Sequence, residues 1–568
     1  MKLRIAVLPA TLAALLLAAC GKDDGPLPPL AYVPADTPYV MGAIEPIPQA
    51  VADEWLRLSN TLLPMYRDLL DQAITELEGK AAEEAEGLAL LRGLRAELEG
   101  KADLAQLADA WGLTLTPLSA FYGIDLVPVM RVELADATRF AEGIARMETA
   151  AGAALTRGTV DELSYWSFQT DEAPLRLVFA TQGNQLVATL APTTADDALL
   201  RRLLGLELPE DNLLDAGTLA DLNKRLGYVA YGSGYLDHAR LFELFAKPMT
   251  GSQGAFLKAL KITPPDATSE ACMSEGRALT AQWPRTAVGY TRFDASGYSM
   301  RALIEAPKPV MDDLRTVLAP TPGLAEAASA LMSFSLALKA DALPPLASKW
   351  ANAVRSAPWT CEALQPLNES FSELGDAMQN PAVYAVGPSA NAFHMLLSKF
   401  ELPPGGFSSG ETPTFEGKLL IGSPNPQGLV AMARNFVPQL AEFRLETDAE
   451  PVALPTLPDS PVELQLFGAA SSQALGIAIG EAQRDSLRAS LAVDAAGPQP
   501  LFQFSYQGKF YGGVMRSVME EAAKADPNAP DMSAMFKLYE DLIERADGQM
   551  LFTADGIEFT AEYVVPKR

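Results

Sequence analysis

Histidine and cysteine are scarce in this 568-residue chain, which has two His and three Cys. A zinc site takes three or four ligands, most of them from these residue types, and most nucleophilic triads need a histidine base. The two histidines, His238 and His394, lie far apart in the sequence and suggest no metal-binding set. We therefore expect no cofactor and no metal site, and we expect that the protein is not an enzyme.

Basic residues are also few relative to acidic ones. Lys and Arg number 44 against 71 Asp and Glu, and the formal net charge is −27. Nucleic-acid binding depends on clustered Lys and Arg, so no nucleic-acid partner is expected. The same deficit argues against broad adhesion to anionic membrane surfaces. Apolar residues make up 49% of the chain, which excludes disorder as its main state.

Long apolar runs are missing beyond the N-terminus, because no later stretch reaches the roughly 18 apolar residues that a membrane-spanning helix needs. The first twenty residues read MKLRIAVLPATLAALLLAAC. Lys2 and Arg4 form a short positive region, and the apolar stretch from Ile5 to Leu17 is too short for a permanent anchor. We interpret residues 1–19 as a signal peptide.

The end of this segment, Leu17-Ala18-Ala19-Cys20, resembles the lipobox of bacterial lipoproteins. The resemblance implies that the chain is cut before Cys20 and that Cys20 carries the lipid anchor. Residues 20–35 would then form a tether, and Gly21, by the sorting rule of that family, implies the outer membrane. We expect the protein on the periplasmic side of that membrane. The alternative is an ordinary secretory signal in which Cys20 has no role.

The two remaining cysteines, Cys272 and Cys361, form an even pair in a chain predicted to be exported. Such a pair predicts a disulfide. The bond would close a loop of about 90 residues between two linking segments. The alternative is a pair of buried free thiols.

The order of predicted elements is repeated along the chain. Residues 125–305 and 418–565 both read as strand, helix, hairpin and helix, followed by strand, helix and a final hairpin. The final hairpins turn near Gly297 and Gly556, and Arg240 and Arg516 are predicted at equivalent helix positions. The alternative is a coincidental likeness between two α+β segments.

We therefore predict an α+β fold with two related halves, at residues 36–310 and 320–568. Each half is expected to have a mainly antiparallel sheet with helices on one face. A run rich in Leu, Ala and Glu at about 60–111 predicts an α-hairpin inserted in the first half.

One nucleophile-elbow pattern, G-x-S-x-G, occurs at Gly406 to Gly410 around Ser408. Its flanks are rich in Pro and Gly, with no predicted strand before it or helix after it, and no histidine follows His394. We interpret this stretch as a loop. The pattern does not change the expectation that the protein is not an enzyme.

Aromatic residues interleaved with glycines are the feature that points to a ligand. Small and aromatic residues together can line an apolar groove, and the alternative is that they are core and turn residues. The residues predicted for this groove are Tyr228, Tyr231, Tyr235, Phe504, Tyr506 and Tyr511.

The segment Pro34-Ala35-Asp36-Thr37 before the first strand resembles, more weakly, the start of large exported lipoproteins to which no activity is assigned. The function predicted first is a non-enzymatic periplasmic lipoprotein, tethered to the outer membrane through its lipid, that binds an envelope protein or an apolar ligand such as a lipid. The alternative is a structural or assembly factor of the cell envelope. An unrecognised hydrolase is the least favoured reading.

Overall fold

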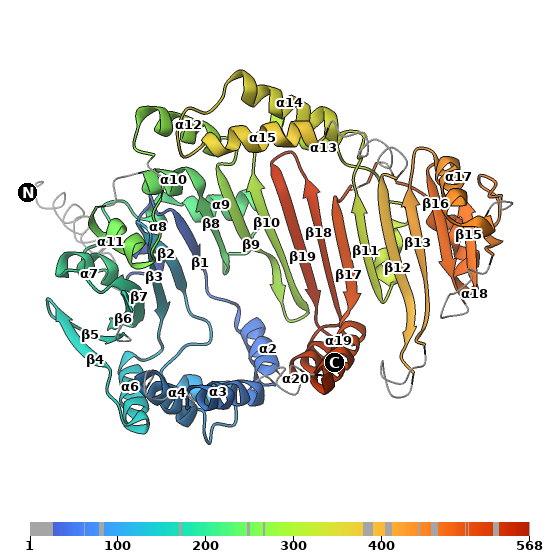
Figure 1. Cartoon of the computed structure of the whole chain (residues 1–568). Helices are drawn as coiled ribbons and strands as arrows, with labels where there is room; N and C mark the ends of the chain where they lie inside the picture. The colour runs from blue at the N-terminus through green and yellow to red at the C-terminus, as the bar shows by residue number, and fades with distance from the viewer. Residues whose placement is uncertain are drawn as a thin grey trace, which may run out of the picture.

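One large antiparallel sheet organises the chain. A computed structural model describes residues 26–61, 63–78, 85–169, 173–246, 250–264, 267–378, 390–403, 412–440, 444–455, 464–494, 496–497, 499–525 and 533–566. Within these residues, 19 strands pair into a single sheet, and all pairs between named strands are antiparallel. With its many helices, the protein has the predicted α+β fold (Figure 1).

The first half contributes ten neighbouring strands to the sheet. From the outer edge inward their order is β4 (Thr156–Val160), β5 (Leu163–Phe168), β6 (Leu175–Gln182), β7 (Gln185–Pro192), β3 (Val127–Glu133), β2 (Ser119–Ile124), β1 (Tyr39–Gly42), β8 (Ser233–Asp237), β9 (Arg285–Asp294) and β10 (Gly297–Glu305).

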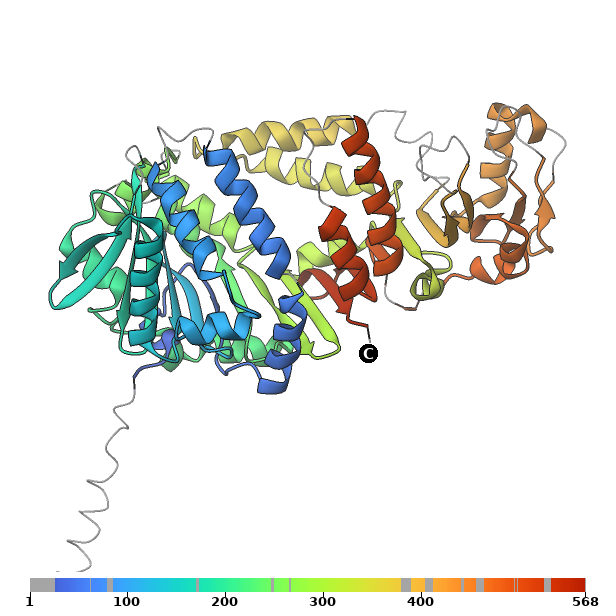
Figure 2. The same ribbon diagram turned by 90° about the horizontal axis from the view of Figure 1, so that it is seen from below.

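The second half repeats this order from the other edge. It runs β14 (Val452–Ala453), β15 (Leu466–Ala470), β16 (Ala474–Ile479), β13 (Thr414–Gly422), β12 (Ala392–Glu401), β11 (Met332–Ala337), β17 (Phe502–Gln507), β18 (Arg545–Phe552) and β19 (Gly556–Val564). These nine strands correspond one to one, in sheet order, to the nine strands of the first half that begin with β5 and end with β10. The two outer edges lie at opposite ends of an elongated molecule (Figure 2).

The halves join where β10 pairs with β19. Arg301 faces Thr560 at the centre of this pair, and the pairing continues equally far in both directions. Gly297 and Gly556 each open their strand at positive φ, 138° and 155°. A Cβ on either glycine would come within 2.0 Å of a carbonyl oxygen on the opposite strand. The two final hairpins therefore lie side by side at the junction of the halves. The repeated strand order supports the predicted duplication, which stays a prediction.

The expected equivalence of Arg240 and Arg516 is wrong. Arg240 is the third residue of α10 (His238–Ala246), whereas Arg516 is the ninth residue of α19 (Gly508–Ala525). That expectation depended on spacing, because Tyr228 and Tyr235 are seven residues apart, as are Phe504 and Tyr511, and each arginine follows five residues later. In the structure Tyr228 precedes β8, so the two pairs do not occupy equivalent positions.

Helices gather beyond both ends of the central strands (Figure 1). At one end lie α12 (Glu270–Thr280), α13 (Lys308–Arg315), α14 (Leu343–Ser356) and α15 (Gln365–Ala377). At the other lie α2 (Gln49–Asn60), α3 (Leu63–Glu78), α4 (Ala85–Glu97), α6 (Ala137–Ala151), α19 and α20 (Ser533–Leu542). The remaining helices are α5 (Leu104–Ala110), α7 (Asp197–Leu204), α8 (Leu213–Ala216), α9 (Thr218–Leu226), α11 (Gly251–Ala259), α17 (Pro426–Phe436), α18 (Glu481–Ser490) and the 3₁₀ turns η1 (Pro29–Tyr32), η2 (Leu324–Ser329) and η5 (Pro438–Leu440).

The helical run at about 60–111 is present as α3, α4 and α5, and ion pairs such as Arg95–Asp71 join α3 to α4. We expected a helical insertion in the first half alone, but the second half has helices at the corresponding position. Helices α14 and α15 connect β11 to β12, just as α2 to α5 connect β1 to β2. The first-half connection is longer. In the described part of the chain, no helix is long and apolar enough to cross a membrane.

Helices cover both faces of the outer strands in the first half, so the expectation of one covered face is also too narrow. Val178 and Val187 belong to the largest buried cluster, together with Leu200 and Leu203 of α7. The neighbouring residue Phe179 faces the opposite side and packs against a second cluster formed with α6. We call the side of Val178 and Val187 the core face of the sheet, and the side of Phe179 the open face.

Candidate functional site

The six aromatic residues predicted to line a groove do not assemble into one site. Tyr228 and Tyr235 are buried in the main cluster of the first half. Burial raises the pKa of Tyr228 to about 12 and raises that of Tyr235. Arg285 lies over the ring of Tyr235, at 4.7 Å from its centroid. These two tyrosines are therefore core residues.

The other four aromatics form two separate contacts. Tyr231 donates a hydrogen bond to the carbonyl of Phe293 in the first half. In the second half, Phe504 stacks on Tyr506, and the ring centroids of Tyr506 and Tyr511 are 4.6 Å apart. Burial raises the pKa of Tyr506. The predicted groove is therefore wrong as a single site.

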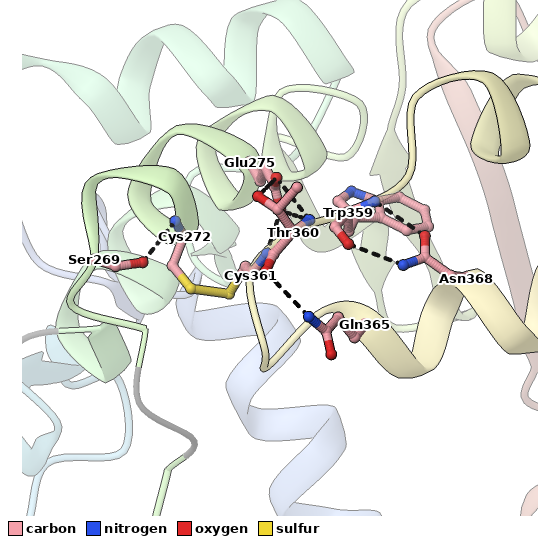
Figure 3. The surroundings of a disulfide bond; sticks show 8 residues. All are labelled: Ser269, Cys272, Glu275, Trp359, Thr360, Cys361, Gln365 and Asn368. Atoms are coloured by element: carbon pink, nitrogen blue, oxygen red, sulfur yellow. Dashed lines mark hydrogen bonds between the residues drawn. A yellow bond between two sulfur atoms is a disulfide. The ribbon is translucent and has the colours of Figure 1, made fainter.

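The predicted disulfide is confirmed, since the sulfurs of Cys272 and Cys361 are 2.07 Å apart (Figure 3). It joins α12 of the first half to the segment between α14 and α15 of the second. The Glu275 carboxylate accepts hydrogen bonds from the backbone N–H groups of Thr360 and Cys361 and from the Thr360 hydroxyl, at 2.9, 3.0 and 2.6 Å. The expectation that both cysteines lie in linking segments is wrong for Cys272, the third residue of α12.

Two further predicted features lie outside the described residues, namely the lipidation site Cys20 and the loop around Ser408. Both histidines lie within the described residues, and each has a ring nitrogen in hydrogen-bonding contact with a neighbouring group. In His238, Nδ1 lies 2.5 Å from the Trp283 carbonyl oxygen and Nε2 lies 3.0 Å from the Thr286 hydroxyl. His394 is fully buried, its Nδ1 donates to the Pro322 carbonyl, and burial lowers its pKa.

The open face of the sheet carries an unusual set of exposed apolar side chains. Directly paired residues on neighbouring strands point to the same face, so the strand register fixes which side each residue takes. On this basis, the nine exposed large apolar residues in the described strands all lie on the open face. They are Phe121, Met130, Leu177, Leu190, Leu236, Leu336, Phe393, Val452 and Phe559.

One row of paired residues crosses nearly the whole sheet on this face without a polar side chain. Exposed apolar patches of this kind mark interaction sites more often than chance positions do. In sheet order the row is Trp166, Phe179, Ala188, Met130, Phe121, Met41, Gly234, Val288, Ala302, Phe559, Met550, Phe502, Leu336, Phe393, Ile421, Leu475 and Ala470.

The row deepens into a pocket at the outer strands of the first half. This apolar pocket has a volume of about 590 Å³ and lies between strands β3, β5, β6 and β7 and helices α4 and α6. Among the described residues, none of the lining side chains is charged or carries an amide, carboxyl or hydroxyl group. The lining residues are Leu77, Gly87, Leu90, Leu91, Leu94, Trp111, Met130, Phe140, Ile144, Met147, Leu155, Phe168, Leu177, Phe179, Leu186 and Ala188.

Helix α6 holds one wall of the pocket in place. Asp136 caps its N-terminus by accepting hydrogen bonds from the N–H groups of Thr138 and Arg139, and Gly152 ends it at a φ of 64°. Phe140 of α6 makes edge contacts with Trp111 and with Trp166 of β5, at centroid distances of 5.8 and 6.4 Å. These fixed rings keep the helix apart from the sheet and leave room for a ligand.

Two polar cavities are weaker candidates. The first, of about 730 Å³, lies at the junction of the halves, but its charges already pair internally as Arg301–Glu558 and Arg545–Asp547, each at 2.6 Å. The second, of about 360 Å³, is lined in part by the Pro34–Thr37 segment. There the fully buried Thr37 accepts a hydrogen bond from the Gly123 N–H and ties the chain before β1 to β2.

Comparisons of the chain with family models, with curated proteins and with solved structures found no match. The candidate site therefore depends on the chemistry of the pocket alone.

The sequence contains a signal for the open face in two strands whose apolar residues do not alternate with polar ones. In residues 120–122 and 395–397, large apolar or aromatic side chains and Ala120 follow one another instead of alternating with polar ones. A strand with two apolar faces is expected where both faces of the sheet are covered. Here the second face is covered only in places.

Proposed function

We propose that this protein is a non-enzymatic lipoprotein that binds an apolar ligand in the apolar pocket. It is anchored through a lipid on Cys20 to the periplasmic side of the outer membrane. The observation that carries the ligand proposal is the lining of this pocket of about 590 Å³, because its described residues are hydrophobic, aromatic or glycine. The anchor proposal rests on the lipobox resemblance of residues 17–20.

The size and chemistry of the pocket support a small apolar ligand. Ligand pockets typically measure roughly 300–1,000 Å³ and are lined mainly by hydrophobic and aromatic side chains. Each apolar square ångström removed from water contributes about 25 cal/mol. The indole N–H of Trp111 already donates to Glu97, so the described lining offers a ligand no free hydrogen-bonding side chain. Such a pocket favours a chain of methylene groups over a polar molecule, because buried polar groups would lose their partners.

Binding of N-phenyl-1-naphthylamine, an uncharged probe that fluoresces in apolar sites, tests the proposal. Ala188 lines the pocket floor between Met130 and Phe179, so Ala188→Trp should fill the pocket and weaken probe binding at least about tenfold. The matched control Ala302→Trp changes the same face away from the pocket and should bind normally. Equal melting temperatures would show that both variants fold. Wild-type protein that does not bind the probe, or an Ala188→Trp variant that binds it unchanged, contradicts the proposal.

Mass spectrometry of the protein purified from its membrane separates the other functions. Co-purifying lipid supports ligand binding, whereas a stoichiometric protein partner without lipid favours an envelope assembly factor. If neither lipid nor a protein partner co-purifies and the protein hydrolyses esters, a hydrolase would be favoured. For the anchor, Cys20→Ser should abolish incorporation of labelled fatty acid and release the protein from the membrane fraction. A wild-type protein that incorporates no label would refute the lipoprotein assignment.

A further inference from the structure

A second, polar pocket adjoins the apolar pocket. Its volume is about 170 Å³, and three residues, Leu90, Leu155 and Phe168, line both cavities. A ligand in the apolar pocket therefore has a polar compartment at one of its borders. The polar pocket takes lining residues from both faces of the sheet, because Phe168 lies on the open face whereas Ser167 and Arg176 pair with Val178 and Ala191 of the core face. Two adjoining compartments of opposite polarity fit a molecule with one apolar and one polar end.

The polar pocket is cationic. Arg176 of β6 lines it, together with Ser167, Thr156 and Gln169, and none of its lining residues within the described part of the chain is acidic. This is notable in a chain with 71 acidic and 44 basic residues. The Nε of Arg176 is buried, and among the described residues it has no hydrogen-bond partner. No ion pair of Arg176 is found within those residues either, whereas most other described arginines pair with a carboxylate, as Arg157 does with Glu148.

The neighbouring carboxylate of Glu148 is already engaged. It accepts hydrogen bonds from the Leu155 N–H at 2.8 Å and from Arg157 at 2.6 Å. A buried guanidinium N–H without an acceptor is costly, so an acceptor supplied by a ligand would be favoured at Arg176. Guanidinium groups bind carboxylate and phosphate oxygens through two parallel hydrogen bonds.

We propose that the two pockets together bind one anionic amphiphile. Its acyl chain lies in the apolar pocket, and its carboxylate or phosphate is bound by Arg176 in the polar pocket. The proposal rests on the proposed function, because it names the class of the apolar ligand. A free fatty acid and a single-chain phospholipid share this chemistry.

Competition with N-phenyl-1-naphthylamine tests the proposal with three probes that share a twelve-carbon chain. The probes are dodecanoate, uncharged 1-dodecanol and lauroyl lysophosphatidylglycerol, each below its micelle concentration. Wild-type protein should bind at least one anionic probe more tightly than 1-dodecanol. Preference for dodecanoate indicates a free fatty acid, and preference for the lysophospholipid indicates a membrane lipid.

In Arg176→Gln, affinity for the preferred anionic probe should fall about tenfold, the lower range for a hydrogen bond to a charged group. Affinity for 1-dodecanol should not change, and Arg176→Lys should restore part of the loss. Arg139→Gln is the matched control, because it removes the same charge from α6 at an exposed pair with Asp109. Unchanged anion binding in Arg176→Gln, or an equal loss for 1-dodecanol, overturns the inference.

The failures of the two proposals are distinguishable. If wild-type protein binds 1-dodecanol as tightly as both anions, the proposed apolar site stands and only the proposed anionic head group is refuted. Wild-type protein that binds none of the three probes overturns both proposals. A normal melting temperature of Arg176→Gln excludes loss of folding as the cause of weaker binding.

Discussion

Removing the disulfide between the halves should lower stability without changing the native structure. The change is Cys272→Ala with Cys361→Ala, because both sulfurs lie in a small apolar cluster that tolerates methyl groups. The Glu275 carboxylate holds the Thr360–Cys361 backbone in place independently of the sulfurs (Figure 3). The effect is therefore expected in the unfolded chain, which gains freedom when the loop opens.

The size of the effect follows from the loop length. The cysteines are 89 residues apart in sequence, and a loop of about 90 residues corresponds to about 4–5 kcal/mol in the loop-entropy relation. Native stability of a folded domain is typically about 5–15 kcal/mol, so the loss is a large share of it.

Guanidinium chloride unfolding measures this loss, with tryptophan fluorescence and circular dichroism as two probes. A chain of this size can unfold in steps, so the comparison uses the transition in which both probes coincide. The single variant Cys272→Ala is the control and should lose nearly as much as the double variant, since either change removes the bond. A double variant within about 1 kcal/mol of wild type would refute the loop-entropy reasoning. Two alkylatable thiols in the native protein would refute the disulfide itself.

Two further predictions concern hydrogen bonding and backbone conformation. The three hydrogen bonds to Glu275 hold its pKa below the usual 4.5, so the stability they add is present above pH 4.5 and is lost as pH falls through the lowered value. Melting temperatures of wild type and Glu275→Gln should differ most near pH 7 and converge in acid, and a constant difference down to pH 3 would contradict this assignment. Gly556→Ala places a Cβ 2.0 Å from the Ile304 carbonyl oxygen at a φ of 155°, so it should cost at least about 1–3 kcal/mol. The control Gly513→Ala, whose Cβ meets only Glu540 at 3.7 Å, should be neutral or stabilising by about 0.5–1 kcal/mol, and an equal loss in both variants would contradict the strain argument.

The α+β class, the final hairpins and the disulfide could be predicted from sequence because each depends on local or countable features. Asp555-Gly556 is a favoured turn pair, and two cysteines permit one pairing. The repeated order of elements was visible for the same reason. The equivalence of Arg240 and Arg516 failed because equal spacing between aromatics does not show on which element each one lies.

The candidate pocket could not be predicted, because it depends on contacts between distant segments. Trp111, Phe140 and Trp166 come from three separate elements and meet only after the sheet has formed. Likewise, Tyr228 resembles a groove residue in sequence, yet the pairing of β8 with β9 buries it against Gly289. Exposure is decided by what covers a face, and local patterns do not contain that information.

The position of the helices explains why the pocket lies in the first half. The two connections between first and second strands, α2–α5 and α14–α15, lie at opposite ends of the central strands (Figure 1). Each meets a helix of the other half. The α14–α15 connection is bonded to α12 through Cys361, and α2 shares a pocket of about 200 Å³ with α20, lined by Trp55 and Tyr539.

These two contacts hold the halves together at both ends of the central strands. The disulfide is a covalent link, and the contact between α2 and α20 is packing. The first-half connection, α2–α5, is the longer of the two and continues beyond its contact with α20. It runs on as α3 and α4, which reach the outer strands, and there Leu90 and Leu94 face Leu177 and Phe179 across the apolar pocket. The apolar row itself crosses both halves. What turns part of it into a pocket is the added length of one connection, so the shape of the apolar pocket should depend on α3 and α4, whereas Arg176 of β6 is the residue proposed to select the head group.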